Sequence, residues 1–170
     1  VCINFGIDEQ GRCLGNTGGH IMFNNFSKNW KYLEEQGIIS NQEYINATFT
    51  QHYRTVEEFR APFDNKDSAI SKSGLILKSC ETMITECPYK IHYSNNKDTM
   101  SPRDYAKTLI PTMRSWSETV FRNALVNRTE REINEIVDKF YNLYIDEVSN
   151  DPEGHSMDYV HVIMDIEKAY

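Results

Sequence analysis

The sequence lacks an excess of basic side chains and lacks a long apolar run. Its 170 residues contain 18 Lys and Arg against 25 Asp and Glu, which gives a formal net charge of -7. A nucleic-acid-binding protein carries a basic face and a membrane-surface domain carries a basic cluster, so the composition argues against both kinds of partner. No apolar stretch approaches the roughly 20 residues that a membrane-spanning helix needs.

Motifs for metal, phosphate and disulfide chemistry are missing as well. The five histidines show no HxxxH or HExxH spacing and the four cysteines form no CxxC pair, so we expect no metal site. The glycines near the N-terminus lack the G-x-G-x-x-G spacing of a phosphate-binding loop. Because a chain of this length folds without disulfide bridges, reduced thiols are expected, and with them a cytoplasmic location.

Helix signals are clear along the chain. Three capping boxes pair a hydroxyl residue with a carboxylate three positions later: Ser40 with Glu43, Thr55 with Glu58 and Thr129 with Glu132. An apolar stripe predicts a helix over residues 130–148. Another amphipathic run begins at Ser101, and Pro111 inside it is expected to kink or break the helix.

Three segments read as strands, at about residues 1–7, 75–86 and 157–167. The first is short and apolar, as a buried strand is. In the last, both the face of Val160 and Val162 and the face of Tyr159 and Ile163 are largely apolar, so we expect it inside a sheet covered on both sides. Strands combined with about five helices predict an α/β fold.

Several motifs follow one another in a recognisable order. They are GGHIMF at 18–23, EQGII at 35–39, YRTVEE at 53–58, PTMRSWSE at 111–118 and DYVHVI at 158–163. The whole chain thereby resembles the C-terminal half of the SABATH-type carboxyl methyltransferases, a family with plant, animal and microbial members that use S-adenosylmethionine. This resemblance implies the C-terminal part of a Rossmann-like class I methyltransferase sheet, mostly parallel with one antiparallel strand, and a helical substrate cap over about 20–73 and 101–126.

The resemblance also implies a substrate pocket. Its expected residues are Met22, Phe23, Tyr53, Met113, Trp116 and Tyr159. An alternative for Trp116 is that it is one more core residue of its helix. No catalytic residue is expected, because a carboxylate is nucleophilic at pH 7 without a general base. The family's metal-associated Asp-x-Phe-Asn is replaced by NATF at 46–49, and its acidic-Gly-x-Gly cofactor loop does not occur in these residues.

The sequence thus predicts an S-adenosylmethionine-dependent O-methyltransferase of a small carboxylic acid, represented by a part that lacks the cofactor loop. The cofactor-binding residues are expected in the family's N-terminal half. A non-catalytic module that binds an apolar acid or a partner chain is the alternative. The sequence leaves a homodimer open, and the unpaired edge of a strand at residues 1–7 is expected to promote association.

Overall fold

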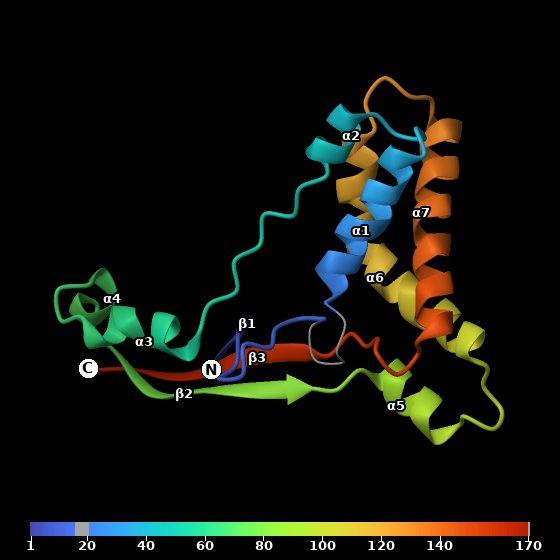
Figure 1. The fold of residues 1–170 in the computed structure, drawn as a ribbon. Coiled ribbons are helices and arrows are strands. Elements are labelled where there is room, and N and C mark those ends of the chain that lie inside the picture. The colour runs from blue at the N-terminus through green and yellow to red at the C-terminus, as the bar shows by residue number, and fades with distance from the viewer. Residues whose placement is uncertain (16–20, 170) are drawn as a thin grey trace.

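The computed structural model describes residues 1–15 and 21–169 (Figure 1). Its elements in chain order are β1 (Cys2–Phe5), α1 (Met22–Glu35), α2 (Asn41–Asn46), α3 (Val56–Asp64), α4 (Ala69–Lys72), β2 (Leu75–Thr85), α5 (Pro88–Asn95), α6 (Pro102–Ala124), α7 (Glu130–Asn150) and β3 (Tyr159–Lys168). The fold is therefore mixed α/β. A helical body made of α1, α2, α6 and α7 stands at one end of a long sheet, and α3 and α4 lie at the other end (Figure 1).

The sheet has the strand order β1-β3-β2, and β3 is antiparallel to both neighbours. The two outer strands therefore run in the same direction. The expected central position of the last strand is confirmed, and Val160 and Val162 are fully buried on one face. The expectation that both faces are covered is wrong for the described residues, because His161 and Ile163 on the opposite face are only half-buried.

The first strand also differs from the expectation. It is shorter than residues 1–7, and all four of its residues are exposed. The physical reason is its place at the edge of the sheet, where only β3 flanks it. Its apolar composition predicted burial, but the side chain of Ile3 is 61% exposed.

The helical body holds the core of the protein. Aromatic rings from three helices meet there, among them Phe26 of α1, Phe121 of α6 and Phe140 of α7. The ring centroids of Phe121 and Phe140 lie 4.1 Å apart. Between α6 and α7, the hydroxyl groups of Ser117 and Tyr141 are hydrogen-bonded at 2.7 Å, so the buried polar atoms of this interface are satisfied.

Local helix signals are borne out. Each of the three expected capping boxes forms, with both reciprocal hydrogen bonds present at the starts of α2, α3 and α7. Pro111 was expected to kink or break the helix, and it does not break it, since α6 continues through this residue. Because proline has no N–H, the carbonyl of Lys107, four residues earlier, lacks its helical donor. Both residues lie on the exposed side of α6, where water can hydrogen-bond to that carbonyl.

The helical layer also differs from the cap expected over 20–73 and 101–126. Helices α1 and α2 do join α6, and α7 completes the body. Helices α3 and α4 instead pack on β2. The apolar side chains Phe59 and Phe63 of α3 line a common groove with Leu75 and Ile166 of the sheet, which explains why this segment covers strands rather than the helical body.

Candidate functional site

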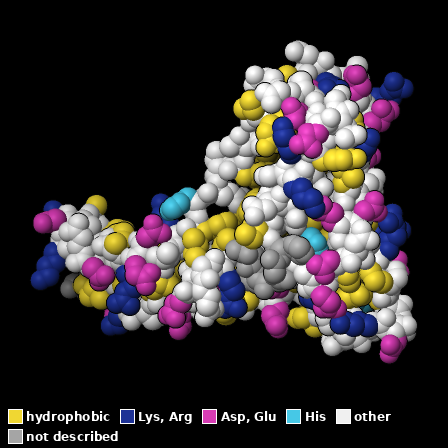
Figure 2. Space-filling model, in the orientation of Figure 1, with side chains coloured by type: hydrophobic (Ala, Val, Ile, Leu, Met, Phe, Trp, Pro, Cys, Tyr) yellow, Lys and Arg dark blue, Asp and Glu magenta, His cyan; other side chains and the backbone are white. Residues whose placement is uncertain are grey.

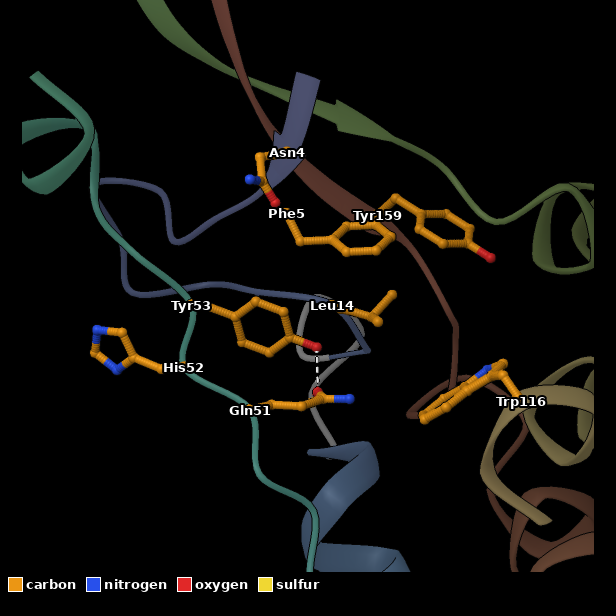
Figure 3. A pocket seen from close by; sticks show the side chains of 8 residues that line it. All are labelled: Asn4, Phe5, Leu14, Gln51, His52, Tyr53, Trp116 and Tyr159. Atoms are coloured by element: carbon orange, nitrogen blue, oxygen red, sulfur yellow. Dashed lines mark hydrogen bonds between the residues drawn. The ribbon is translucent and has the colours of Figure 1, made fainter. Parts of the chain in front are cut away.

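A cavity of about 540 Å³ lies at the inner corner between the sheet and the helical body, where hydrophobic side chains gather on the surface (Figure 2). Its lining combines the end of β1, the start of β3, the middle of α6, and the segment that joins α2 to α3 (Figure 3). The lining residues are Asn4, Phe5, Leu14, Gln51, His52, Tyr53, Trp116 and Tyr159.

One wall of the cavity is a strip of aromatic rings on the uncovered face of the sheet. Phe5 and Tyr159 lie nearly parallel, with ring centroids 5.7 Å apart and an interplanar angle of 21°. The ring of His161 extends the strip, at 5.5 Å from Phe5 and 5.8 Å from Tyr159. Strand pairing explains this alignment, because Phe5 pairs with His161 and Tyr159 precedes His161 by two residues on the same face.

The opposite wall comes from Tyr53 and Trp116, both half-buried. Phe23 lies behind them, with its ring centroid 6.2 Å from that of Trp116 and 6.5 Å from that of Tyr53. The Tyr53 hydroxyl donates a hydrogen bond of 2.6 Å to the side-chain oxygen of Gln51. Burial raises the pKa of Tyr53 to about 12, so its phenol stays protonated at neutral pH and remains a donor.

The cavity is lined mainly by uncharged side chains. None of the lining residues is Lys, Arg, Asp or Glu. His52 points away from the space between the aromatic walls (Figure 3), and its ring nitrogen lies 3.6 Å from a carboxylate oxygen of Glu58. Across residues 1–15 and 21–169, no group of three or more His, Cys, Asp and Glu side chains is placed to hold a metal ion. Such a lining suits an apolar ligand that is fixed by few hydrogen bonds.

The structure separates the six residues expected from the sequence into three groups. Tyr53, Trp116 and Tyr159 line the cavity together. Phe23 supports the wall from behind. Met22 and Met113 lie in the core, with exposed fractions of 1% and 0%, so they offer no surface to a ligand in this cavity.

Local packing explains the position of Met22. Its side chain rests on Gly15, where an added Cβ would approach it to 2.7 Å. The positive φ of 68° at Gly15 also favours glycine at this turn. The neighbouring motif residues Gly18, Gly19 and His20 lie outside the described residues.

Sequence reasoning missed five lining residues: Asn4, Phe5, Leu14, Gln51 and His52. Phe5 was recognisable as the last apolar residue of its strand, and Gln51 and His52 as polar neighbours of Tyr53. Leu14 is in a loop, and no local pattern marks it. What brings these residues together is strand pairing and the path of the α2–α3 segment.

No family model matches the chain, and no curated protein matches it significantly. Among the described helices, none is long and apolar enough to cross a membrane. The geometry of the cavity therefore carries the functional argument.

Proposed function

We propose that this protein binds a small carboxylic acid in the aromatic cavity and serves in its O-methylation by S-adenosylmethionine. The observation that carries the proposal is the cavity itself. Three residues expected to contact the substrate, Tyr53, Trp116 and Tyr159, come from distant parts of the chain and line one space of about 540 Å³. This volume is in the range of pockets that bind small molecules.

The arrangement of the strands is further support. The central strand β3 is antiparallel to both β1 and β2, and the outer two run in the same direction. A mostly parallel sheet with one antiparallel strand is what the family resemblance implies. In the described sheet both neighbouring pairs are antiparallel, so the match is limited to the central antiparallel strand, and the parallel, Rossmann-like part of the sheet is proposed.

The residues of the cavity have a simple task in the proposed reaction. A carboxylate needs no general base at neutral pH, so the protein has to hold the acid in position and keep water away from it. The rings of Phe5 and Tyr159 on one side and Trp116 on the other form apolar walls for this purpose. Restricting the acid to one orientation supplies several kcal/mol of the barrier reduction in reactions of this kind.

The aromatic cavity offers no charged side chain to S-adenosylmethionine. The cavity lining lacks Lys, Arg, Asp and Glu side chains, which would pair with the charged amino-acid part of that molecule. The acidic-Gly-x-Gly motif does not occur in the sequence. The proposal therefore assigns acid binding to this chain and cofactor binding to residues outside it. We expect calorimetry with the 170-residue chain to detect no S-adenosylmethionine binding, and micromolar binding would contradict this assignment.

The same lack of a cofactor motif favours a second function, a non-catalytic module that binds an apolar acid. Both functions predict that the chain binds small acids, so methyl transfer has to be measured to separate them. The experiment uses the protein purified from its natural source, a panel of aromatic and aliphatic acids, and S-adenosylmethionine labelled in the methyl group. Labelled methyl esters are the expected product. Acid binding without any labelled ester would contradict the enzyme and leave the binding module.

A further inference from the structure

We propose that Gln51 donates the hydrogen bond that recognises the carboxylate of the bound acid, and that Tyr53 is the positioning residue that orients Gln51. The inference rests on the proposed function for the presence of an acid in the cavity. Beyond that function, it names Gln51 as the side chain that distinguishes an acid from its methyl ester.

The orientation of the Gln51 side chain is set by its neighbour two residues later. The Tyr53 hydroxyl donates to the amide oxygen of Gln51 at 2.6 Å. With its oxygen engaged, the amide turns its nitrogen away from Tyr53 and toward Trp116 (Figure 3). A primary amide nitrogen carries two N–H donors and no acceptor. The donors of Gln51 therefore point to the part of the cavity next to Trp116.

The other polar lining residues are less suited to this task. His52 points away from the space and lies 3.6 Å from Glu58. Asn4 projects from β1 on the side of the cavity remote from Trp116 (Figure 3). The Tyr53 hydroxyl already donates its hydrogen bond to Gln51 and has no second proton to donate to a ligand. Gln51 is the lining residue whose donors point toward Trp116.

A carboxylate is the acceptor that fits this donor best. No Asp or Glu lines the cavity, so an anion meets no like charge from the lining. A hydrogen bond from an amide to a carboxylate is charge-assisted and is therefore stronger than one to a neutral acceptor. A methyl ester offers only neutral acceptors. The site should therefore hold the acid more tightly than the ester, which favours release of the product.

The test is a pair of titrations on the isotope-labelled 170-residue chain, one with benzoate and one with methyl benzoate. The indole N–H signal of Trp116 reports binding, and that of Trp30, which is 2% exposed in the core, serves as internal reference. The variants are Gln51→Ala, Gln51→Glu, Tyr53→Phe and the double variant. The matched control is Gln42→Ala, which removes an exposed amide of α2 that bonds only to Asn46 in the described contacts.

We expect Gln51→Ala to raise the dissociation constant of benzoate about tenfold and that of methyl benzoate by a clearly smaller factor. Gln51→Glu should weaken benzoate more, because a carboxylate then faces the ligand's carboxylate. Tyr53→Phe should weaken benzoate about threefold, since the amide becomes free to rotate. Adding Tyr53→Phe to Gln51→Ala should cause no further loss, because Tyr53 acts through Gln51.

Three results would overturn the inference: unchanged benzoate affinity in Gln51→Ala, equal weakening of benzoate and methyl benzoate, or no benzoate binding to the unaltered chain at millimolar concentration. The role of Gln51 and the proposed methyl transfer can be contradicted independently. Gln51-dependent benzoate binding without methyl transfer by the natural protein would contradict the enzyme and keep the acid anchor. Methyl transfer with an unchanged KM in Gln51→Ala would contradict the anchor and keep the enzyme.

Discussion

The helical body and the sheet differ in how far their large apolar side chains are exposed to solvent. In the body, Phe26, Phe121 and Phe140 are at most 1% exposed. In the sheet, Ile76 and Met83 of β2 are 47% and 45% exposed. Since hydrophobic stabilisation scales with the apolar area removed from water, the body should carry most of the folding free energy. The sheet is left with apolar surface for binding, and the cavity lies where the two regions meet.

The largest effect should come from removing a ring in the body. Phe121→Ala deletes a side chain whose centroid lies 4.1 Å from Phe140 and 4.9 Å from Trp30, and we expect a loss of about 3–5 kcal/mol in the free energy of unfolding. Phe5→Ala, which removes a 39% exposed ring of the sheet, should cost about 1–2 kcal/mol. Urea denaturation of both variants measures the difference. Equal losses would contradict the contrast between the two regions.

A partly buried ion pair joins α2 to the segment between α6 and α7. The guanidinium of Arg128 makes two hydrogen bonds of 2.7 Å to the carboxylate of Glu43, and it holds the pKa of Glu43 down at about 2. The pair therefore stabilises the fold fully above about pH 4.5, and this stabilisation is lost as the pH falls through about 2. Glu43→Gln should cost about 3 kcal/mol at pH 7.

The pH dependence separates this effect from a packing loss. Between pH 4.5 and 2, the unfolding free energy of the unaltered protein should fall more steeply than that of Glu43→Gln. The control is Glu135→Gln, a change at a 66% exposed carboxylate of α7, which should shift the unfolding free energy by less than about 0.5 kcal/mol. Parallel pH profiles for the unaltered protein and Glu43→Gln would contradict the role of this pair.

Trp116 lies on the boundary between the two regions. It is half-buried, lines the cavity, and still contacts the ring of Phe26 in the core. Trp116→Ala should therefore cost about 2 kcal/mol, less than Phe121→Ala, and lower the melting temperature by only a few degrees. The enlarged cavity should raise the affinity for 1-naphthoate relative to benzoate about threefold. Unfolding of the variant, or an unchanged ratio of the two affinities, would identify Trp116 as a core residue.

The smallest change in stability should come from the edge of the sheet. Ile3 is 61% exposed on β1, and Ile3→Lys should alter the unfolding free energy by less than about 0.5 kcal/mol. Its effect should appear in association instead, because exposed apolar edge strands recruit other chains and lysine blocks such pairing. Light scattering at micromolar concentration should show larger species for the unaltered chain than for the variant. A monodisperse monomer in both cases would contradict an adhesive edge.

Features encoded over a few residues were predictable from the sequence. The capping boxes at Ser40, Thr55 and Thr129 formed as expected, because each needs only two residues three positions apart. The exposure of β1 was not predictable, since it depends on whether a second neighbour lies beside the strand. The continuity of α6 through Pro111 depends on the exposure of that side of the helix, which the residue type alone does not reveal.

The residues of the cavity could likewise be predicted only in part from the sequence. On α6, Met113 and Trp116 are three residues apart and share a broad apolar face, yet one is in the core and the other lines the cavity. Sequence periodicity identifies this apolar face, but it does not show which of its residues lie in the core and which line the cavity. Gln51 was missed for a different reason: the role proposed for it depends on a hydrogen bond to Tyr53 within an irregular segment, where no periodic pattern applies.

The central claim is that a small acid binds between the sheet and the helical body. The most direct measurement is a set of isotope-filtered nuclear Overhauser effects between unlabelled benzoate and the labelled 170-residue chain. We predict transfer from the benzoate ring to Phe5, Tyr159 and Trp116, the three aromatic residues that face one another across the cavity, and none to Trp30 in the core. Transfer confined to residues elsewhere on the surface would contradict the account.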